Sequence, residues 1–156
     1  MPLPARIISG AQTGVDRAAL DVALKLGIPC GGWCPAGRRA EDGVIPTRYP
    51  VEETPSPEYS ERTEWNVRDS DGTLIVVRNP PTGGTAQTIE FARRHQRPVL
   101  ILDPGDPDAA RRLREWLQAH GIRILNVAGP REGTDPGIGE VVREAMTDWM
   151  KGEGIG

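Results

Sequence analysis

The chain has 156 residues, 37% of them hydrophobic and 26% charged, which suits one domain with a single hydrophobic core. The formal net charge of -3 argues against general binding to nucleic acid or to acidic membranes, so any site for an anion must be local. With no run long enough to span a bilayer, no signal peptide pattern and only two cysteines, Cys30 and Cys34, the sequence predicts a cytoplasmic protein with reduced thiols.

The first predicted element is a short apolar run, residues 5–9, which indicates a buried strand followed by a glycine turn and a helix. Apolar side chains from Leu20 onward repeat with helical spacing, and Gly27 can end that helix in a left-handed cap. The first turn of a helix has free N–H groups and the positive end of the peptide dipole, which attract anions. The turn is therefore a candidate anion site, although Thr13 and Asp16 also have the spacing of a purely structural capping box.

The middle of the chain predicts two strands and two helices around a second glycine turn. The proline-rich stretch 34–57 reads as a long irregular loop, of a kind that is usually functional or disordered. Thr85 follows two glycines and can cap the helix after it. The predicted elements here are strands at 28–33 and 73–77 and helices at 57–67 and 86–95.

The last third of the chain continues the alternation. Asp106 and Pro107 supply an N-cap and a first-position proline for a helix that Gly121 ends. The other predicted elements are strands at 98–102 and 122–127, a helix from Asp135, and a frayed tail at 151–156 of the single domain 1–156.

Strands and helices alternate throughout, which is typical of parallel β-α-β units with right-handed crossovers. The sequence therefore predicts an α/β fold: one Rossmann-like three-layer sandwich with a parallel five-stranded sheet in the order 2-1-3-4-5. That order makes the first and third strands neighbours. Their loops, at Gly10 and Gly83, then flank one crevice at the carboxyl ends of the strands.

Two glycine loops that meet at such a crevice can point their amides at one phosphate or oxyanion. Neither loop is a dinucleotide fingerprint or a P-loop, because a third spaced glycine and a Gly-Lys-Ser/Thr ending are both missing. Ordinary NAD and ATP sites are therefore disfavoured. The predicted anion cradle consists of Gly10, Ala11, Gln12, Thr13, Gly14, Asp16, Gly83, Gly84 and Thr85.

A second group of candidate residues carries charged or polar side chains near the same crevice. Arg39 can clamp an anion through its guanidinium, while Glu41 and Asp42 can accept hydrogen bonds from hydroxyl or amine groups. Arg62 and Asn66 join them if their helix borders the crevice. The structural alternative for all five is a solvated surface, which is the usual state of a charge run.

No catalytic or metal-binding group emerges from the sequence. Cys30 and Cys34 have no nearby histidine to complete a zinc site, since His95 and His120 are distant in the chain. Both histidines also fall at predicted helix ends, where the helix dipole alone explains them and a Ser-His-Asp arrangement is hard to assemble. We therefore expect a binding site without catalytic residues and without a metal.

Several longer segments resemble one known family. They are Gly-Ala-Gln-Thr-Gly-Val-Asp-Arg, Gly-Gly-Trp-Cys-Pro-Ala-Gly-Arg-Arg-Ala-Glu-Asp-Gly, Arg-Thr-Glu-Trp-Asn-Val-Arg-Asp-Ser-Asp-Gly-Thr, Gly-Gly-Thr and Asn-Val-Ala-Gly-Pro-Arg. On these segments the chain resembles the putative molybdenum carrier family, which is similar to the SLOG superfamily of Rossmann-like folds. Members of that superfamily include molybdenum cofactor carriers, cytokinin-activating phosphoribohydrolases, nucleotide sensors and a single-strand DNA loader.

The resemblance implies a protein that binds an anionic nucleotide-like or pterin-like ligand, with molybdenum cofactor or molybdate as its cargo. It leaves two alternatives open, namely a phosphoribohydrolase acting on nucleoside 5'-monophosphates and a nucleotide-sensing signalling module. We also expect a homo-oligomer whose partner is a small anionic ligand, not nucleic acid or a membrane.

One departure from the phosphoribohydrolase pattern bears on chemistry. Those enzymes resemble one another in a Pro-Gly-Gly-x-Gly-Thr-x-x-Glu motif, whereas Thr88 stands here in place of the glutamate. The nearest acid, Glu90, is rotated by about 200° around the helix and should not replace it. In the enzyme alternative, base loss would have to be assisted by Glu41, Asp42 or Glu64.

Overall fold

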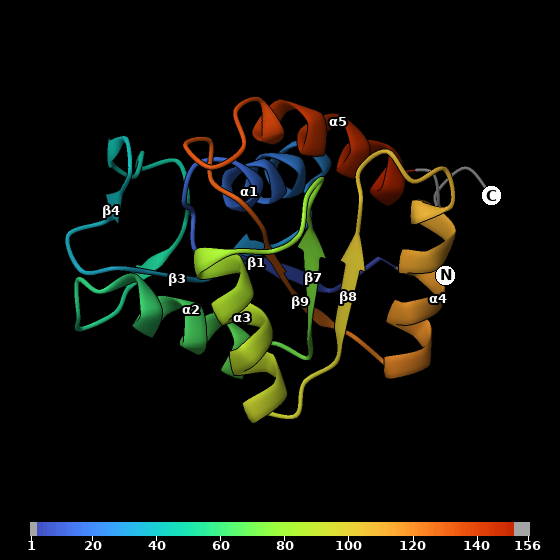
Figure 1. Cartoon of the computed structure of the whole chain (residues 1–156), viewed down its shortest axis with the longest axis horizontal. Coiled ribbons are helices and arrows are strands. Elements are labelled where there is room, and N and C mark those ends of the chain that lie inside the picture. The colour runs from blue at the N-terminus through green and yellow to red at the C-terminus, as the bar shows by residue number, and fades with distance from the viewer. Residues whose placement is uncertain (1–2, 152–156) are drawn as a thin grey trace.

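The computed structural model describes residues 3–151 and shows a three-layer α/β sandwich (Figure 1). A five-stranded parallel sheet forms the middle layer, and helices cover both of its faces, so the predicted fold class is confirmed. The helices on one face are α1 (Val15–Leu26), α4 (Ala109–His120) and α5 (Ile138–Lys151), and those on the other are α2 (Tyr59–Arg68) and α3 (Gly83–Arg94).

The large sheet differs from the prediction in the place of its last strand. Its strands, in spatial order, are β2 (Cys30–Gly31), β1 (Arg6–Ile8), β9 (Ile124–Ala128), β7 (Gly72–Val76) and β8 (Val99–Leu102). Counted along the chain, this order is 2-1-5-3-4, so the predicted order 2-1-3-4-5 is wrong. Consecutive strands are neighbours only as a tendency. Leu125, Asn126 and Val127 are all buried, and a central position gives β9 cover on both faces and both edges.

The helix ends also correct some predicted caps. α3 begins at Gly83 with Thr82 as its N-cap, so Thr85 lies in the first turn and does not cap the helix. Gly14 is the N-cap of α1, and the capping box considered for Thr13 does not form. The N-cap is glycine in α1 and threonine in α3, and in neither helix does the side chain of the N-cap residue make a capping hydrogen bond.

The other two helices toward the C-terminus start later than predicted. Asp108 precedes α4, while Asp106 accepts a hydrogen bond from the Asp108 N–H at 2.8 Å. The backbone of Gly121 is left-handed as predicted, and so is that of Gly27 at the end of α1. Lys151, placed in the predicted tail, is the last residue of α5, and the rest of that tail lies outside the described residues.

The long proline-rich stretch is ordered by one side chain. Arg38 donates hydrogen bonds to four backbone carbonyls of this stretch, at distances between 2.8 and 3.1 Å. Tyr49 is buried beneath it in a small apolar cluster of its own. Short strand pairs complete the stretch, β3 (Trp33–Cys34) with β6 (Glu52–Glu53) and β4 (Arg39–Ala40) with β5 (Gly43–Val44).

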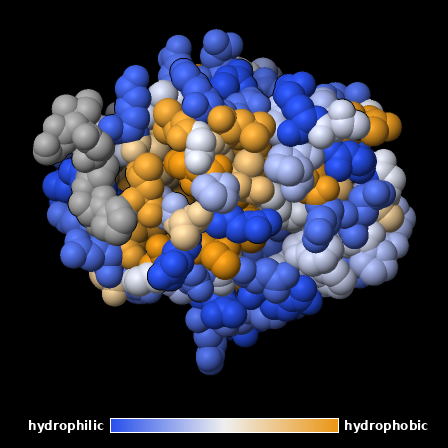
Figure 2. Space-filling view, turned by 180° about the vertical axis from the view of Figure 1, so that it is seen from behind, coloured by the Kyte–Doolittle hydropathy of each residue, from blue (hydrophilic) through white to orange (hydrophobic). Residues whose placement is uncertain are grey.

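Seen from behind, hydrophobic residues gather on one part of the surface and hydrophilic residues border them (Figure 2). No helix between residues 3 and 151 combines the length and the apolar character needed to cross a membrane. Within the described part of the chain, the large apolar side chains that are exposed are Leu3, Leu24, Val44 and Ile101.

Candidate functional site

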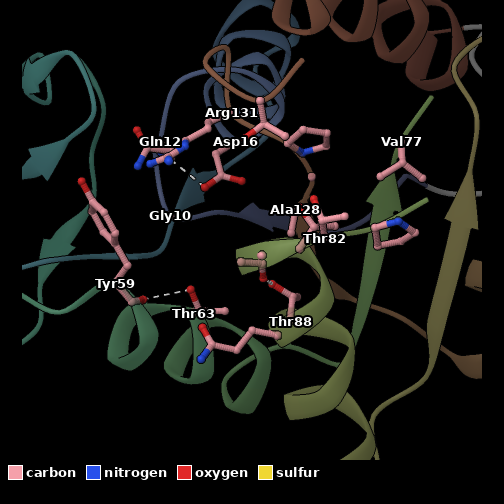
Figure 3. A pocket seen from close by; sticks show the side chains of 18 of the residues that line it. Gly10, Gln12, Asp16, Tyr59, Thr63, Val77, Thr82, Thr88, Ala128 and Arg131 are labelled. Carbon is pink, nitrogen blue, oxygen red and sulfur yellow. Dashed lines mark hydrogen bonds between the residues drawn. The ribbon is translucent and has the colours of Figure 1, made fainter. Parts of the chain in front are cut away.

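The main cavity lies where two neighbouring strands send the chain to opposite faces of the sheet. β9 leads to α5 on one face, and β7 leads to α3 on the other, so the loops after these strands diverge. In an open parallel sheet, such a switch point leaves a crevice at the carboxyl ends of the strands. Here the crevice is a cavity of about 560 Å³. Figure 3 shows Asp16 on one side of it, Thr63 of α2 below and Thr88 of α3 opposite.

The cavity brings together residues from both predicted glycine loops and from α2. Eight of the fourteen predicted site residues line it, and six do not. Those that line it are Gly10, Gln12, Asp16, Arg62, Asn66, Gly83, Gly84 and Thr85.

The start of α3 presents open backbone to the cavity. Gly83 has a φ of 51°, in the left-handed region that favours glycine, and Thr82 makes no capping hydrogen bond with its side chain. A Cβ added to Gly84 would meet no heavy atom within 4 Å. The first N–H groups of α3 are thus accessible to a ligand, and the helix dipole favours an anionic one.

Arg62 brings a positive charge to the wall of the cavity. Only 7% of its surface is exposed, and its guanidinium donates to the Gly10 carbonyl at 2.7 Å and to the Thr63 hydroxyl at 3.3 Å. It takes part in none of the ion pairs found among residues 3–151. Burial lowers the pKa of Arg62, and the nearby Asp16 carboxyl opposes this effect. A Cβ on Gly10 would lie 2.6 Å from Nη1 of Arg62, which explains the glycine at that position.

Asp16 is a buried carboxyl group beside this arginine. It is 8% exposed and accepts a hydrogen bond from the Gln12 N–H at 3.3 Å. Burial raises the pKa of Asp16 to about 6, although Arg62 and the backbone N–H of Gln12 act in the opposite direction. The site therefore holds a group that changes its charge near neutral pH.

The deeper part of the cavity is polar but uncharged. Asn126, in the middle of β9, is 2% exposed and donates to the Thr73 hydroxyl at 3.2 Å. Asn66 exchanges two hydrogen bonds with the backbone of Trp33, and the Thr88 hydroxyl donates to the Gly84 carbonyl at 2.9 Å. Buried amides and hydroxyls offer directional contacts to a ligand without adding charge.

The sequence of this chain matches one known protein family over almost its whole length. The circularly permutated YpsA SLOG family matches it over residues 7–150. The chain belongs to this family. Its strand order agrees with a permuted Rossmann sheet, because counting β9 first instead of last turns 2-1-5-3-4 into 3-2-1-4-5. The resemblance to SLOG proteins found in the sequence is thereby confirmed.

One solved structure supports this placement of the SLOG chain. It is the crystal structure of a putative molybdenum carrier protein from Syntrophus aciditrophicus SB, which is 46% identical in sequence. The match covers 96% of each chain with a TM-score of 0.92. No protein of curated function matches this chain.

The predicted site residues of this SLOG chain that do not line the cavity mostly brace its rim. The Thr13 hydroxyl donates to the Glu41 carboxylate, which also accepts the Gly133 N–H at 3.0 Å. Asp42 forms a bidentate ion pair with Arg17, at 2.5 and 2.8 Å. These contacts tie the first turn of α1 to the long loop and to the loop after β9.

Three further predicted residues also lie outside the lining. Arg39 is exposed, donates to the Pro57 carbonyl at 2.9 Å and stacks over the Tyr59 ring. Gly14 has a φ of 83°, and a Cβ there would lie 2.3 Å from the Pro130 carbonyl, so it permits close packing of two loops. Ala11 is fully buried in the small cluster under the long loop.

The sequence prediction missed the loop that follows β9. Ala128, Gly129, Pro130 and Arg131 line the cavity because β9 lies between β1 and β7. The signal was present as a Gly-Pro-Arg segment directly after a strand, but the predicted order put that strand at the edge of the sheet. Among the described residues, no group of three or more His, Cys, Asp or Glu side chains is placed to hold a metal ion.

Proposed function

We propose that this protein binds and carries an anionic ligand of nucleotide or pterin size, and that molybdenum cofactor is this ligand. The size of the cavity supports the proposal, because about 560 Å³ falls within the range of roughly 300 to 1,000 Å³ that is usual for small organic ligands. An inorganic oxyanion such as molybdate would fill only one corner of it. The name of the similar Syntrophus protein, "putative molybdenum carrier protein", supports the choice of cargo.

The observation that carries the proposal is the buried charge of Arg62. Burial of this cation is costly, the neighbouring Asp16 carboxyl and the Tyr59 ring offset that cost only in part, and a bound anion would offset more of it. The open first turn of α3 lies on the same cavity and adds N–H donors to the same anion. A phosphorylated ligand fits this arrangement with its phosphate at Arg62 and Gly84 and its ring system toward Asn126.

We propose carriage instead of hydrolysis because the three carboxylates named for the enzyme alternative do not line the cavity, and Asp16, which does, lies beside Arg62. Glu41 and Asp42 are engaged at the rim, and Glu64 lies 2.8 Å from His95. Thr88 lies in the cavity wall, at the position where the phosphoribohydrolase motif has its glutamate. Glu90 is paired with Arg93 on the outer side of α3. A site that holds ground state and transition state equally gives affinity without rate acceleration.

A substitution in the first turn of α3 tests the proposal. Gly84→Val should leave the fold intact, since its Cβ meets open space, but should place methyl groups where the phosphate binds. The matched control is Ala86→Val, an exposed position of the same helix that does not line the cavity. Isothermal titration calorimetry with molybdate, a nucleoside monophosphate and a pterin phosphate measures binding to each protein.

We expect the pterin phosphate to bind the wild type and Ala86→Val, and binding to Gly84→Val to be lost. Undiminished binding to a folded Gly84→Val protein would remove the α3 cradle from the proposal. Molybdate binding as tightly as the pterin phosphate would assign the oxyanion itself as cargo. Enzymatic release of base from the nucleoside monophosphate would favour the hydrolase alternative.

A further inference from the structure

β8 is an edge strand whose outer backbone groups have no neighbouring strand. β7 pairs with it on one side only, and the N–H groups of Thr73 in β7 and of Val77 just after it donate to the carbonyls of Pro98 and Leu102 at 3.0 Å. Backbone groups of a strand alternate in direction from one residue to the next. The N–H and C=O groups of Val99 and Ile101 therefore point away from β7, along the free edge of the sheet.

The helices that contact β8 pack against its two faces. α4 packs on the opposite face, where Leu113 and Leu117 share a cluster with Leu102 of β8. Val99 is directed to the other face, against Phe91 of α3, and Ile101 lies beyond the helix with 43% of its surface exposed. Figure 1 shows β8 as the outermost strand of the sheet, next to β7, with α4 farther out in this view. Natural sheets usually block such an edge with a charge or a bulge, and here its centre is aliphatic.

The sequence along this edge is self-complementary. In an antiparallel pairing of two copies about Leu100, Val99 lies opposite Ile101 of the second copy and Arg97 lies opposite its Asp103. Val99 and Ile101 share one face of β8 because side chains alternate with a period of two, and Arg97 and Asp103 lie just outside the strand at its two ends. Arg97 and Asp103 are both exposed; within one copy Arg97 donates to the Arg68 carbonyl at 3.1 Å and Asp103 accepts from the Gly105 N–H at 2.7 Å. An apolar centre is thus flanked at each end by opposite charges, a pattern that matches a second copy of this chain and not an arbitrary peptide.

We propose that two copies of this chain form a dimer by antiparallel pairing of their β8 strands, which joins the two sheets into one. The register about Leu100 places the outward N–H and C=O of Val99 against those of Ile101, so both residues form hydrogen-bonded pairs. The arrangement is isologous, as a two-fold dimer requires. Cross-strand aliphatic pairs and opposite charges both stabilise such a ladder.

Charge reversal tests the register as well as the surface. Arg97→Asp and Asp103→Arg each place like charges opposite one another at both ends of the homodimer, and like-charge contacts across an interface are strongly unfavourable. We expect each variant alone to dimerise at least about tenfold more weakly than the wild type. An equimolar mixture of the two variants restores opposite charges at both ends and should form a heterodimer with near wild-type affinity. Sedimentation equilibrium measures all three samples.

A second variant acts on the backbone. Ile101→Pro removes an N–H that points away from β7, so the ladder within one copy is kept while the edge loses a donor. Leu24→Ser, at an exposed apolar position on α1, is the matched control and should leave the dimer intact. A monomeric wild type at about 100 µM, where even a micromolar interface is mostly dimeric, would overturn the proposal. A dimer that tolerates Arg97→Asp, or one that Leu24→Ser dissociates, would also overturn it.

Discussion

One face of the sheet is closed by a large apolar cluster, and the other carries a small one next to the polar cavity at the carboxyl ends of the strands. On the face of α1, α4 and α5, Leu74, Leu125 and Val127 join one large cluster with side chains from all three helices. On the face of α2 and α3, the corresponding cluster is small, and Asn126 stands among hydroxyl and amide groups. Adjacent residues of β9 thus have different roles: Leu125 and Val127 pack in the apolar core, and Asn126 lines the cavity. The comparison teaches that stability is concentrated on one face, which frees the other for a polar site.

The largest expected effect comes from the apolar face. Leu125→Ala removes a fully buried side chain and should lower the free energy of unfolding by about 2 to 5 kcal/mol. Thr88→Val, nearly isosteric on the opposite face, loses one hydrogen bond and should cost about 1 kcal/mol. Urea unfolding of both variants measures the difference. Equal losses would mean that the two faces contribute alike and would break the comparison.

The second effect concerns the charge on the cavity face. Arg62→Met should weaken binding of a pterin phosphate by about 10- to 100-fold, because a charged hydrogen bond contributes roughly 1.5 to 3 kcal/mol. Its free energy of unfolding should change little, because removing a buried guanidinium offsets the loss of its hydrogen bond to Gly10 and of its attraction to Asp16. Arg39→Met is the matched control, exposed and outside the cavity lining, and should change affinity less than about twofold. Calorimetry and thermal unfolding test these outcomes, and a large loss of stability in Arg62→Met would contradict them.

The smallest effect is a dependence of binding on pH. The pKa of Asp16 is about 6, against an ordinary value of 3.8, so Asp16 gains negative charge beside the anion site as pH rises through 6. Binding of sulfate, whose charge is constant over this range, should therefore weaken with rising pH by up to about tenfold. Asp16→Asn should remove the dependence. A pH profile of sulfate affinity that is the same in both proteins would exclude Asp16 as its cause.

The raised pKa of Asp16 also makes the stability of the fold depend on pH. The pKa of Asp16 is higher in the folded chain than its ordinary value, so the folded state holds this proton between about pH 4 and 6 while the unfolded state releases it. The free energy of unfolding should therefore fall as pH rises through that window, relative to Asp16→Asn. Urea unfolding of both proteins across the window checks the sign.

Much of the fold was predictable because its signals are local. Strand and helix periodicity gave the alternation, and the left-handed caps at Gly27 and Gly121 follow from glycine alone. The position of β9 was not predictable in this way. Its residues Ile124 to Ala128 look like any other buried strand, and only the packing of distant segments decides that they lie at the centre of the sheet.

The candidate site shows the same division. Gly10 and Gly83 were identified because glycine turns after strands are visible in sequence, and both line the cavity. Arg131 was missed because its place depends on the strand order. The charge of a side chain also did not predict whether it faces the cavity, since Arg62 lies in the cavity wall while Arg39 lies on the surface. Whether a side chain reaches the cavity depends on the turn of the helix or loop that carries it.

The central place of β9 has a consequence for how the chain is made. During synthesis, β1 and β7 leave the ribosome long before the strand that must lie between them. An N-terminal fragment without β9 has no continuous sheet, and its two halves expose strand edges that are buried in the finished protein. Closing the sheet requires contacts between distant parts of the chain, which slows folding. The cavity, whose wall includes the loop after β9, therefore forms only when nearly the whole chain is available.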